Sequence, residues 1–183
     1  EYIINNDNGI TSFEFNIDGD VLDEETIRLL SEAREGQIVF NMDIASTNAE
    51  VLEACGRSEN IYRLMYNTTK LLRSGNVRTD IHIKAGLPHE TEAMFARSFN
   101  KAYGMAEGMP VHIDNLYMSK GTMLRAKAHD FGYIYADDAP YEVIATGNMT
   151  ADELLRIRAI GRIVESYIGD GGFKKSIPRI LND

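Results

Sequence analysis

The chain has 183 residues, 44% of them hydrophobic, and a formal net charge of −9 at pH 7. This length and composition suit one well-packed domain, and the acidic charge with scattered Lys and Arg excludes the basic footprint of a nucleic-acid-binding protein. The only cysteine, Cys55, excludes an internal disulfide framework and fits a reducing compartment. No segment reaches the roughly 18 apolar residues of a membrane-spanning helix. The sequence therefore predicts a cytoplasmic protein without membrane or nucleic-acid partners.

Four times along the chain, a short run of apolar residues, or of alternating apolar and polar residues, is followed by a helical pattern. The first residues, from Glu1 to Ile4, resemble the last turn of a helix without an initiator Met, which predicts a fragment of a longer protein. Strands that alternate with helices predict βαβ units and a parallel sheet with right-handed crossovers. The predicted strands are residues 11–17, 37–44, 77–85 and 111–118, and the predicted helices are residues 23–34, a short helix after Asn48, and residues 59–73, 89–106 and 122–130.

Capping residues predict where several helices begin and end. Asn48 is a suitable N-cap, and Gly75 is a suitable residue to end the helix that precedes it. Pro88 suits the first turn of the following helix, where its missing N–H costs nothing.

The last part of the chain predicts an extension rather than another strand-helix repeat. It contains a short strand near residues 133–135, a loop through Pro140, and a helix over residues 151–167 that opens with a capping box from Thr150 to Glu153. We therefore predict later βα units of a barrel over residues 1–131 and a C-terminal extension with one helix over residues 132–183.

Each predicted strand has one apolar face and one polar face, because side chains alternate along a strand. A parallel sheet covered on both sides would be apolar on both. The pattern therefore predicts a curved sheet with helices outside and a polar cavity inside. The fold class is α/β: a partial TIM-type (βα) barrel of about four parallel strands with outer helices. The residues of the polar faces are Glu14, Asn16, Asn41, Asp43, Asp80, His82, Lys84, His112 and Asp114.

A functional site is predicted where the polar faces meet the carboxyl ends of the strands, as in other barrels. Asn16, Asp43, Lys84 and Asp114 lie at that end, and His82 lies one layer below. Two other interpretations remain open: an ordinary solvated sheet face, and a divalent metal site. The second would draw its ligands from Glu14, Asp43, His82, His112 and Asp114, which have no compact metal-binding spacing.

Three segments resemble, in order and spacing, motifs of the radical S-adenosylmethionine (SAM) superfamily. FNMDIASTN at residues 40–48 resembles the pattern Phe-Glu-hydrophobic-Gly-Val-Gln-Ser-x-Asn. HIKAGLPHET at residues 82–91 resembles Asp-Leu-Ile-x-Gly-Leu-Pro-x-Glu-Thr. LYMSKGTML at residues 116–124 resembles Leu-Lys-x-x-x-Gly-Thr-Pro-Leu, and the tail around Pro140 is similar to the iron–sulfur oxidoreductases that carry a cobalamin-binding domain.

The resemblance implies the later strands of a partial (βα)₆ barrel. In that family a [4Fe–4S] cluster reduces SAM to methionine and a 5′-deoxyadenosyl radical, which abstracts a hydrogen atom from the substrate. By the same resemblance, Ser46 would approach the ribose or methionine part, Gly86 would pack near the adenine, and Leu116 and Met118 would offer it backbone contacts. The cofactor-binding residues expected in this way are Asn16, Asn41, Asp43, Ser46, Lys84, Gly86, Leu116 and Met118.

The chain departs from the family pattern at several positions. The cluster motif CxxxCxxC is absent, which places the cluster in a missing N-terminal part and predicts that the fragment alone is inactive. Asp43 and Lys84 put charge where the pattern has glycine and an apolar residue. A metal-dependent barrel hydrolase and a diverged, non-catalytic barrel module therefore remain alternative functions. The other departures are Asn41, Ala45, His82 and Met123.

Overall fold

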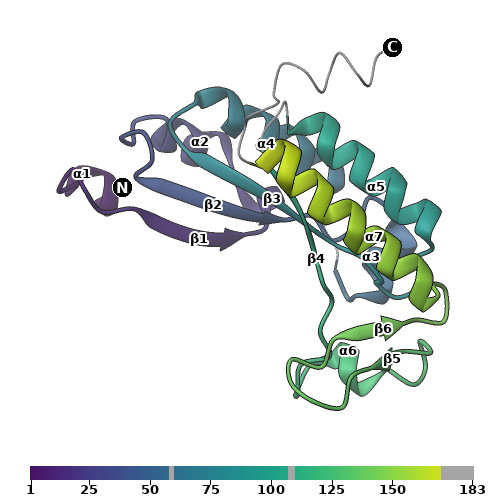
Figure 1. Cartoon of the computed structure of the whole chain (residues 1–183). Helices are drawn as coiled ribbons and strands as arrows, with labels where there is room; N and C mark the ends of the chain where they lie inside the picture. Colours follow the sequence, from purple (N-terminus) through teal and green to yellow (C-terminus); the bar gives the residue numbers. More distant parts are fainter. Residues whose placement is uncertain (58–59, 107–109, 170–183) are drawn as a thin grey trace, which may run out of the picture.

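Four parallel strands in the order β1–β2–β3–β4 form the central sheet of the chain (Figure 1). The computed structural model describes residues 1–57, 60–106 and 110–169. The predicted α/β fold with a four-stranded parallel sheet is confirmed. The strands are β1 (Phe13–Ile17), β2 (Ile38–Asp43), β3 (Arg78–Lys84) and β4 (Val111–Asp114).

The larger helices pack side by side along the outer face of this sheet. Contacts run from α2 to α4, from α4 to α5 and from α5 to α7, while α4 and α5 contact β3 and α7 contacts β4 (Figure 1). The helices are α1 (Tyr2–Asn5), the 3₁₀ turn η1 (Gly19–Val21), α2 (Glu24–Leu30), α3 (Ala49–Ala54), α4 (Ile61–Ser74), α5 (Glu92–Met105), α6 (Met123–Ala126), α7 (Ala151–Val164) and the π-helical turn η2 (Glu165–Gly169).

Side-chain caps begin several of these helices as the sequence predicts. The Asn48 side chain accepts a hydrogen bond from the Glu50 amide at 2.9 Å, and Gly75 ends α4 with a left-handed φ of 76°. Thr150 and Glu153 form the predicted capping box at the start of α7. Residue 59, the predicted start of the helix before Gly75, lies outside the described residues.

The helix after β3 begins three residues later than predicted. Pro88 lies in a turn, and α5 starts only at Glu92, where the Thr91 hydroxyl caps the Met94 amide at 3.3 Å. The reason is the Glu90 carboxyl group, which accepts hydrogen bonds from the amides of Gly86 at 3.1 Å and Leu87 at 3.3 Å. This tight turn has to end before helical geometry can begin, so the prediction of Pro88 in the first helical turn was wrong.

The apolar faces of the inner strands form the core against the helices. Met42, Ile81 and Ile83 are fully buried, and the Met42 sulfur contacts Thr68 on α4. Phe15 on the edge strand β1 stays 38% exposed, so the helical layer covers the apolar face of β1 less completely than the sequence predicts. On the opposite faces Asp80 is buried, but the polar residues nearer the carboxyl ends of the strands are only partly buried, which leaves a polar inner face as predicted.

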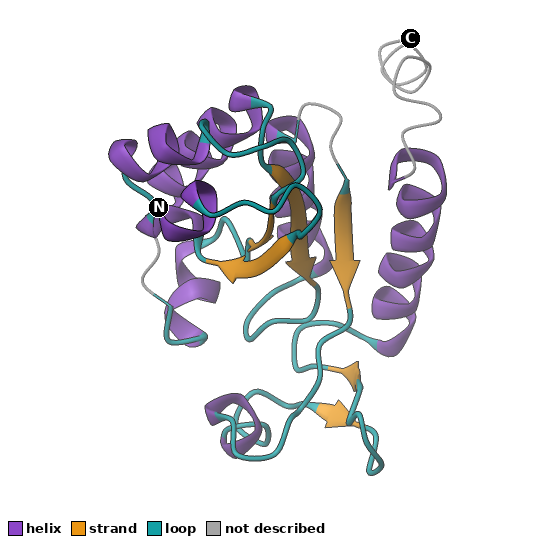
Figure 2. Cartoon of the chain, turned by 90° about the vertical axis from the view of Figure 1, so that its left-hand side faces the viewer, coloured by secondary structure: helices purple, strands orange, loops and turns teal. Residues whose placement is uncertain are grey.

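The segment between β4 and α7 forms a small unit beyond the carboxyl ends of the strands (Figure 2). It consists of α6 and the antiparallel pair of β5 (Ile134–Tyr135) and β6 (Val143–Ala145). The strand near residues 133–135 was predicted, whereas β6 was not. The predicted strand over residues 111–118 ends at Asp114 because Leu116 and Met118 pair instead with Val143 and Tyr141, with backbone hydrogen bonds of 2.9 Å.

The helix predicted over residues 122–130 is shorter in the structure. Only α6 (Met123–Ala126) is helical, and turns follow as far as Gly132. The Tyr133 amide donates to the Ala128 carbonyl at 2.9 Å, and Gly132 has a left-handed φ of 64°. This turn redirects the chain into β5, so the helical pattern cannot continue.

The C-terminal helix α7 packs on the edge of the sheet. Gly161 allows a close approach to β4, since a Cβ atom there would lie 3.1 Å from the Ile113 Cβ atom. The predicted division between residues 131 and 132 stays a prediction. Within the described part of the chain, no helix combines the length and apolar character needed to cross a membrane.

Two adjacent leucines of α7 test how much this packing stabilises the fold. Leu154 is 3% exposed and lies against Gly86, whereas Leu155 is 56% exposed. Leu154→Ala should lower the free energy of unfolding by about 2–5 kcal/mol, because it leaves a cavity in the core. Leu155→Ala should change it by less than about 0.5 kcal/mol. Urea denaturation of both variants measures the difference, and equal effects would contradict the packing described here.

The buried Glu90 carboxyl group should make stability depend on pH. Glu90 is fully buried, and its Oε1 atom has no hydrogen-bond partner among the described residues. Burial raises the pKa of Glu90 from 4.5 to about 8, against the opposing effect of the two amides that it accepts from. Between these pH values the folded chain binds more protons than the unfolded chain, so the free energy of unfolding falls as pH rises.

Glu90→Gln should remove this pH dependence, since the amide keeps the acceptor oxygen and stays neutral. The wild type should lose roughly 1 kcal/mol per pH unit relative to the variant between pH 5 and 7. Urea denaturation at several pH values measures the slope. Glu32→Gln, at an exposed carboxylate, should keep the slope of the wild type. Parallel profiles for wild type and Glu90→Gln would show that Glu90 is charged in the folded chain.

Candidate functional site

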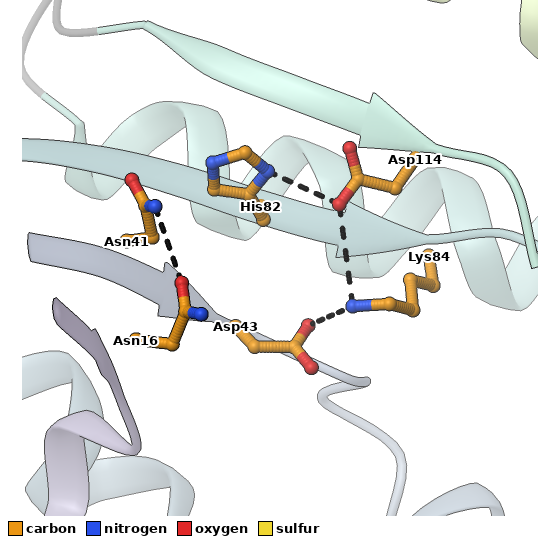
Figure 3. Close-up of a pocket in the computed structure, with 6 residues that line it drawn as sticks. All are labelled: Asn16, Asn41, Asp43, His82, Lys84 and Asp114. Atoms are coloured by element: carbon orange, nitrogen blue, oxygen red, sulfur yellow. Dashed lines mark hydrogen bonds and ion pairs between the residues drawn. The ribbon is translucent and has the colours of Figure 1, made fainter. Parts of the chain in front are cut away.

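A polar cavity of about 390 Å³ opens on the inner face of the sheet, near the carboxyl ends of the strands (Figure 3). Its volume lies in the range of small-molecule sites. All four strands contribute to its lining, which consists of Asn16, Asn41, Asp43, His82, Lys84 and Asp114.

Parallel register brings these side chains together. Asn16 on β1 is the register partner of Asn41 on β2, and Lys84 on β3 is the partner of Asp114 on β4. Asp43 is likewise level with His82. Because paired residues of neighbouring strands point to the same face, polar residues at every second position become neighbours in space. The sheet therefore assembles the polar face that the alternation predicts.

Lys84 lies between two carboxylates of the neighbouring strands (Figure 3). Its Nζ atom is 3.0 Å from Asp43 Oδ1 and 4.0 Å from Asp114 Oδ2. Asp43 Oδ2 accepts a hydrogen bond of 3.1 Å from Arg57, whose guanidinium group also contacts Asp18 at 2.8 Å. The carboxylate of Asp43 therefore has a cation beside each oxygen, which offsets the cost of its partial burial.

Arg57 was not predicted from the sequence. It follows α3 in a loop, where no strand periodicity indicates the direction of its side chain. The only sequence feature that indicates a cation there is Asp43, a carboxylate at the end of β2 without a cationic neighbour in the sequence.

Two amide side chains form the other end of the cavity. Asn41 Nδ2 donates to Asn16 Oδ1 at 3.2 Å and to Glu14 Oε1 at 2.7 Å. Amide groups both donate and accept hydrogen bonds, so this end suits hydroxyl or amine groups of a ligand.

His82 and Asp114 form a hydrogen-bonded pair on the lining of the cavity. His82 Nδ1 lies 3.1 Å from Asp114 Oδ2, and its ring stacks on His112 with 4.8 Å between centroids. The hydrogen bond to Asp114 raises the pKa of His82, against the effect of burial. Burial alone would raise the pKa of Asp114, but the hydrogen bond and charge of His82, with the charge of Lys84, lower it.

A second, more apolar cavity of about 270 Å³ adjoins the first and shares Asp43 and Lys84 with it. Its walls come from the ends of β2 and β3 with the loops that follow them, the end of α3 with the loop after it, and the segment around α6. The other lining residues are Ala45, Ala54, Cys55, Arg57, Leu87, Met123, Leu124, Lys127 and Phe131.

Ser46 does not line either cavity. Its side chain is fully buried, where its hydroxyl lies 3.3 Å from that of Ser98 on α5 and accepts a hydrogen bond from the Asn48 amide at 3.1 Å. Ser46 therefore tethers the loop after β2 to α5. Its predicted approach to a ribose or methionine group stays a prediction.

The other three predicted cofactor-binding residues are engaged within the chain. Gly86 has a left-handed φ of 86°, and its carbonyl accepts the Tyr133 hydroxyl at 2.8 Å. The Leu116 carbonyl and the Met118 amide pair with the segment around β6. The structure thus gathers Asn16, Asn41, Asp43 and Lys84 in one cavity. It places Gly86, Leu116 and Met118 in the loops that follow β3 and β4, outside the lining of both described cavities.

The residues considered as metal ligands do not converge. In the described part of the chain, no three His, Cys, Asp or Glu side chains are grouped so that they could hold a metal ion. Asp43 is paired with Lys84 and Arg57, and Asp114 with His82.

A comparison with solved structures finds a protein with a similar fold. The chain is similar to coproporphyrinogen III oxidase (HemN) from Escherichia coli, a radical SAM enzyme, with a TM-score of 0.58 and 15% sequence identity. The match covers 84% of this chain and 32% of the enzyme, so the chain spans about a third of that enzyme's length. At this identity the similarity concerns the fold alone.

Two comparisons at the sequence level add little about function. A family model described as "Protein of unknown function (DUF4080)" matches residues 129–183, and no curated protein matches the chain. The chain therefore has an α/β fold with a four-stranded parallel sheet and a C-terminal helix, and this fold is similar to part of the barrel of that radical SAM enzyme.

Proposed function

We propose that this chain is the C-terminal part of the barrel of a radical SAM oxidoreductase, whose parent protein reductively cleaves SAM and acts on a small-molecule substrate. Three motifs that resemble this family in sequence begin on β2, on β3 and after β4, in a fold that is similar to that of a radical SAM enzyme. The observation that carries the proposal is the polar cavity between these strand ends, to which all four strands contribute.

The two adjoining cavities fit the chemistry of SAM. The polar cavity offers amides, carboxylates and a lysine to hydroxyl, amine and carboxylate groups. The neighbouring cavity offers Leu87, Leu124 and Phe131 to a flat apolar group such as adenine. A molecule with both kinds of group would occupy the two cavities across Asp43 and Lys84, which line both.

Each polar residue has a separate task in this proposal. Asn16 and Asn41 would bind hydroxyl groups through their amides. Asp43 would accept a hydrogen bond from a hydroxyl or amine group, and Lys84 would pair with a carboxylate. Because Lys84 lies beside Asp43 and Asp114, the cavity holds little net charge before a ligand enters.

The iron–sulfur cluster requires ligands that this chain does not supply. Such clusters are held by several cysteine thiolates, and the sequence contains only Cys55. The proposal therefore assigns the cluster to a part of the parent protein outside this chain, and this chain alone is expected to be inactive. When bound there, the cluster and SAM would supply the one-electron cleavage that starts radical chemistry.

The proposal includes a separate cobalamin-binding domain in the parent protein. Its support is the resemblance of the tail around Pro140 to oxidoreductases of that type. An absorbance spectrum of the full-length protein purified with cobalamin tests this part on its own.

The full-length protein should bind iron and sulfide and convert SAM to 5′-deoxyadenosine under reducing, anaerobic conditions. Chromatography of the reaction products measures this conversion. A protein that carries the cluster but forms no 5′-deoxyadenosine would contradict the proposal and favour a non-catalytic module. A parent sequence without any CxxxCxxC motif would contradict it as well.

Asp43→Asn should weaken SAM binding by the full-length protein about tenfold or more, because a charge-assisted hydrogen bond is lost. Equilibrium dialysis with SAM measures the dissociation constant. Asp18→Asn is the matched control, since Asp18 also pairs with Arg57 but does not line the polar cavity. Its dissociation constant should stay within about twofold of the wild type. Equal effects of the two substitutions would exclude a direct role of Asp43.

A further inference from the structure

We infer that His82 is a proton-transfer residue of the polar cavity, held by Asp114 so that its Nε2 atom exchanges a proton with a hydroxyl group of a bound small molecule. This inference rests on the geometry of the cavity and not on the proposed SAM chemistry, so the two can fail separately.

The hydrogen bond to Asp114 sets the tautomer of His82. Asp114 Oδ2 lies 3.1 Å from Nδ1, and an ionised carboxylate can only accept, so Nδ1 carries the hydrogen atom. In the neutral ring, Nε2 then carries the lone pair of a base. None of the described residues forms a hydrogen bond with Nε2, which lies on the side of the ring away from Asp114 (Figure 3).

The surroundings hold the ring in place. His82 stacks on His112 with an angle of 21° between the rings, and the Nδ1 atom of His112 lies 3.4 Å from Glu165 Oε1. Stacking on one face and a hydrogen bond at one edge leave little freedom for rotation. His82 is one of the six residues that line the polar cavity.

The charges around His82 favour a gain of one proton. Asp114 and His112 face it from β4, Lys84 and Asp80 from its own strand, and Asp43 is its register partner on β2. The hydrogen bond and charge of Asp114 raise the pKa of His82, while Lys84 opposes this effect. A group that titrates near neutral pH can both accept and return a proton there.

The proposed step moves one proton and no other group. The O–H bond of the ligand breaks, an N–H bond forms at His82 Nε2, and the electron pair stays on the ligand oxygen. Asp114 stabilises the resulting imidazolium, and the ammonium group of Lys84 lies in the same cavity to stabilise the negative oxygen. The reverse transfer returns the proton, so the step needs no oxidant or reductant.

Two measurements on the 183-residue chain test this inference. Nitrogen-15 NMR should find neutral His82 as the Nδ1–H tautomer, with a titration midpoint above 6.5. Asp114→Asn should lower this midpoint by about one pH unit. Asp152→Asn, in the exposed first turn of α7, should leave it unchanged.

Diethyl pyrocarbonate, which acylates neutral imidazole nitrogens, should modify His82 when mass spectrometry maps the products. His129 is fully exposed and serves as the internal control. A neutral Nε2–H tautomer would overturn the inference, and so would unmodified His82 in a sample where His129 reacts. The tautomer and the modification are both measured on the wild-type chain, so both tests remain valid even if Asp114→Asn fails to fold.

Discussion

The position of Lys84 between Asp43 and Asp114 is the interaction on which the inner face of the sheet depends. A curved sheet with helices on one side leaves its other face half-buried, and a charged group there is costly unless an opposite charge lies beside it. Lys84 provides that charge to two strands at once, at 3.0 Å from Asp43 and 4.0 Å from Asp114. Arg57 and His82 complete the arrangement on either side, so no carboxylate of the cluster is left without a cationic or hydrogen-bonding partner.

This arrangement links the fold to its proposed chemistry. Parallel strands end at the same edge, and their register aligns residues that are far apart in the chain. Apolar residues at the alternate positions of β2, β3 and β4 pack against α4, α5 and α7, which holds the polar side chains of these strands in place. A ligand that enters the cavity would exchange hydrogen bonds with groups that are already oriented, rather than order them first. The conformational entropy of these side chains is thus lost during folding and not during binding.

Much of this fold follows from local patterns in the sequence, whereas parts of the site do not. Alternation along Asn41–Asp43 and His82–Lys84 predicts the polar face, and Asn48 and Thr150 predict helix starts, because both effects act within a few residues. Two other features depend on contacts that no local pattern predicts. Arg57 contacts Asp43 from a loop, and the Glu90 carboxyl group stabilises the turn that delays the start of α5. The contact of Ser46 with Ser98 has no local signal either, because the chain turns after β2 and strand alternation no longer gives the direction of the Ser46 side chain.

The central claim is that the carboxyl ends of the four strands form one ligand site. Hydrogen–deuterium exchange of the full-length protein, with and without saturating SAM, tests it most directly. The account predicts slower exchange in peptides that cover residues 41–48, 82–91 and 114–118, and unchanged exchange in α2, which lies on the outer face. Unchanged exchange in all three segments, or protection confined to the outer helices, would contradict it.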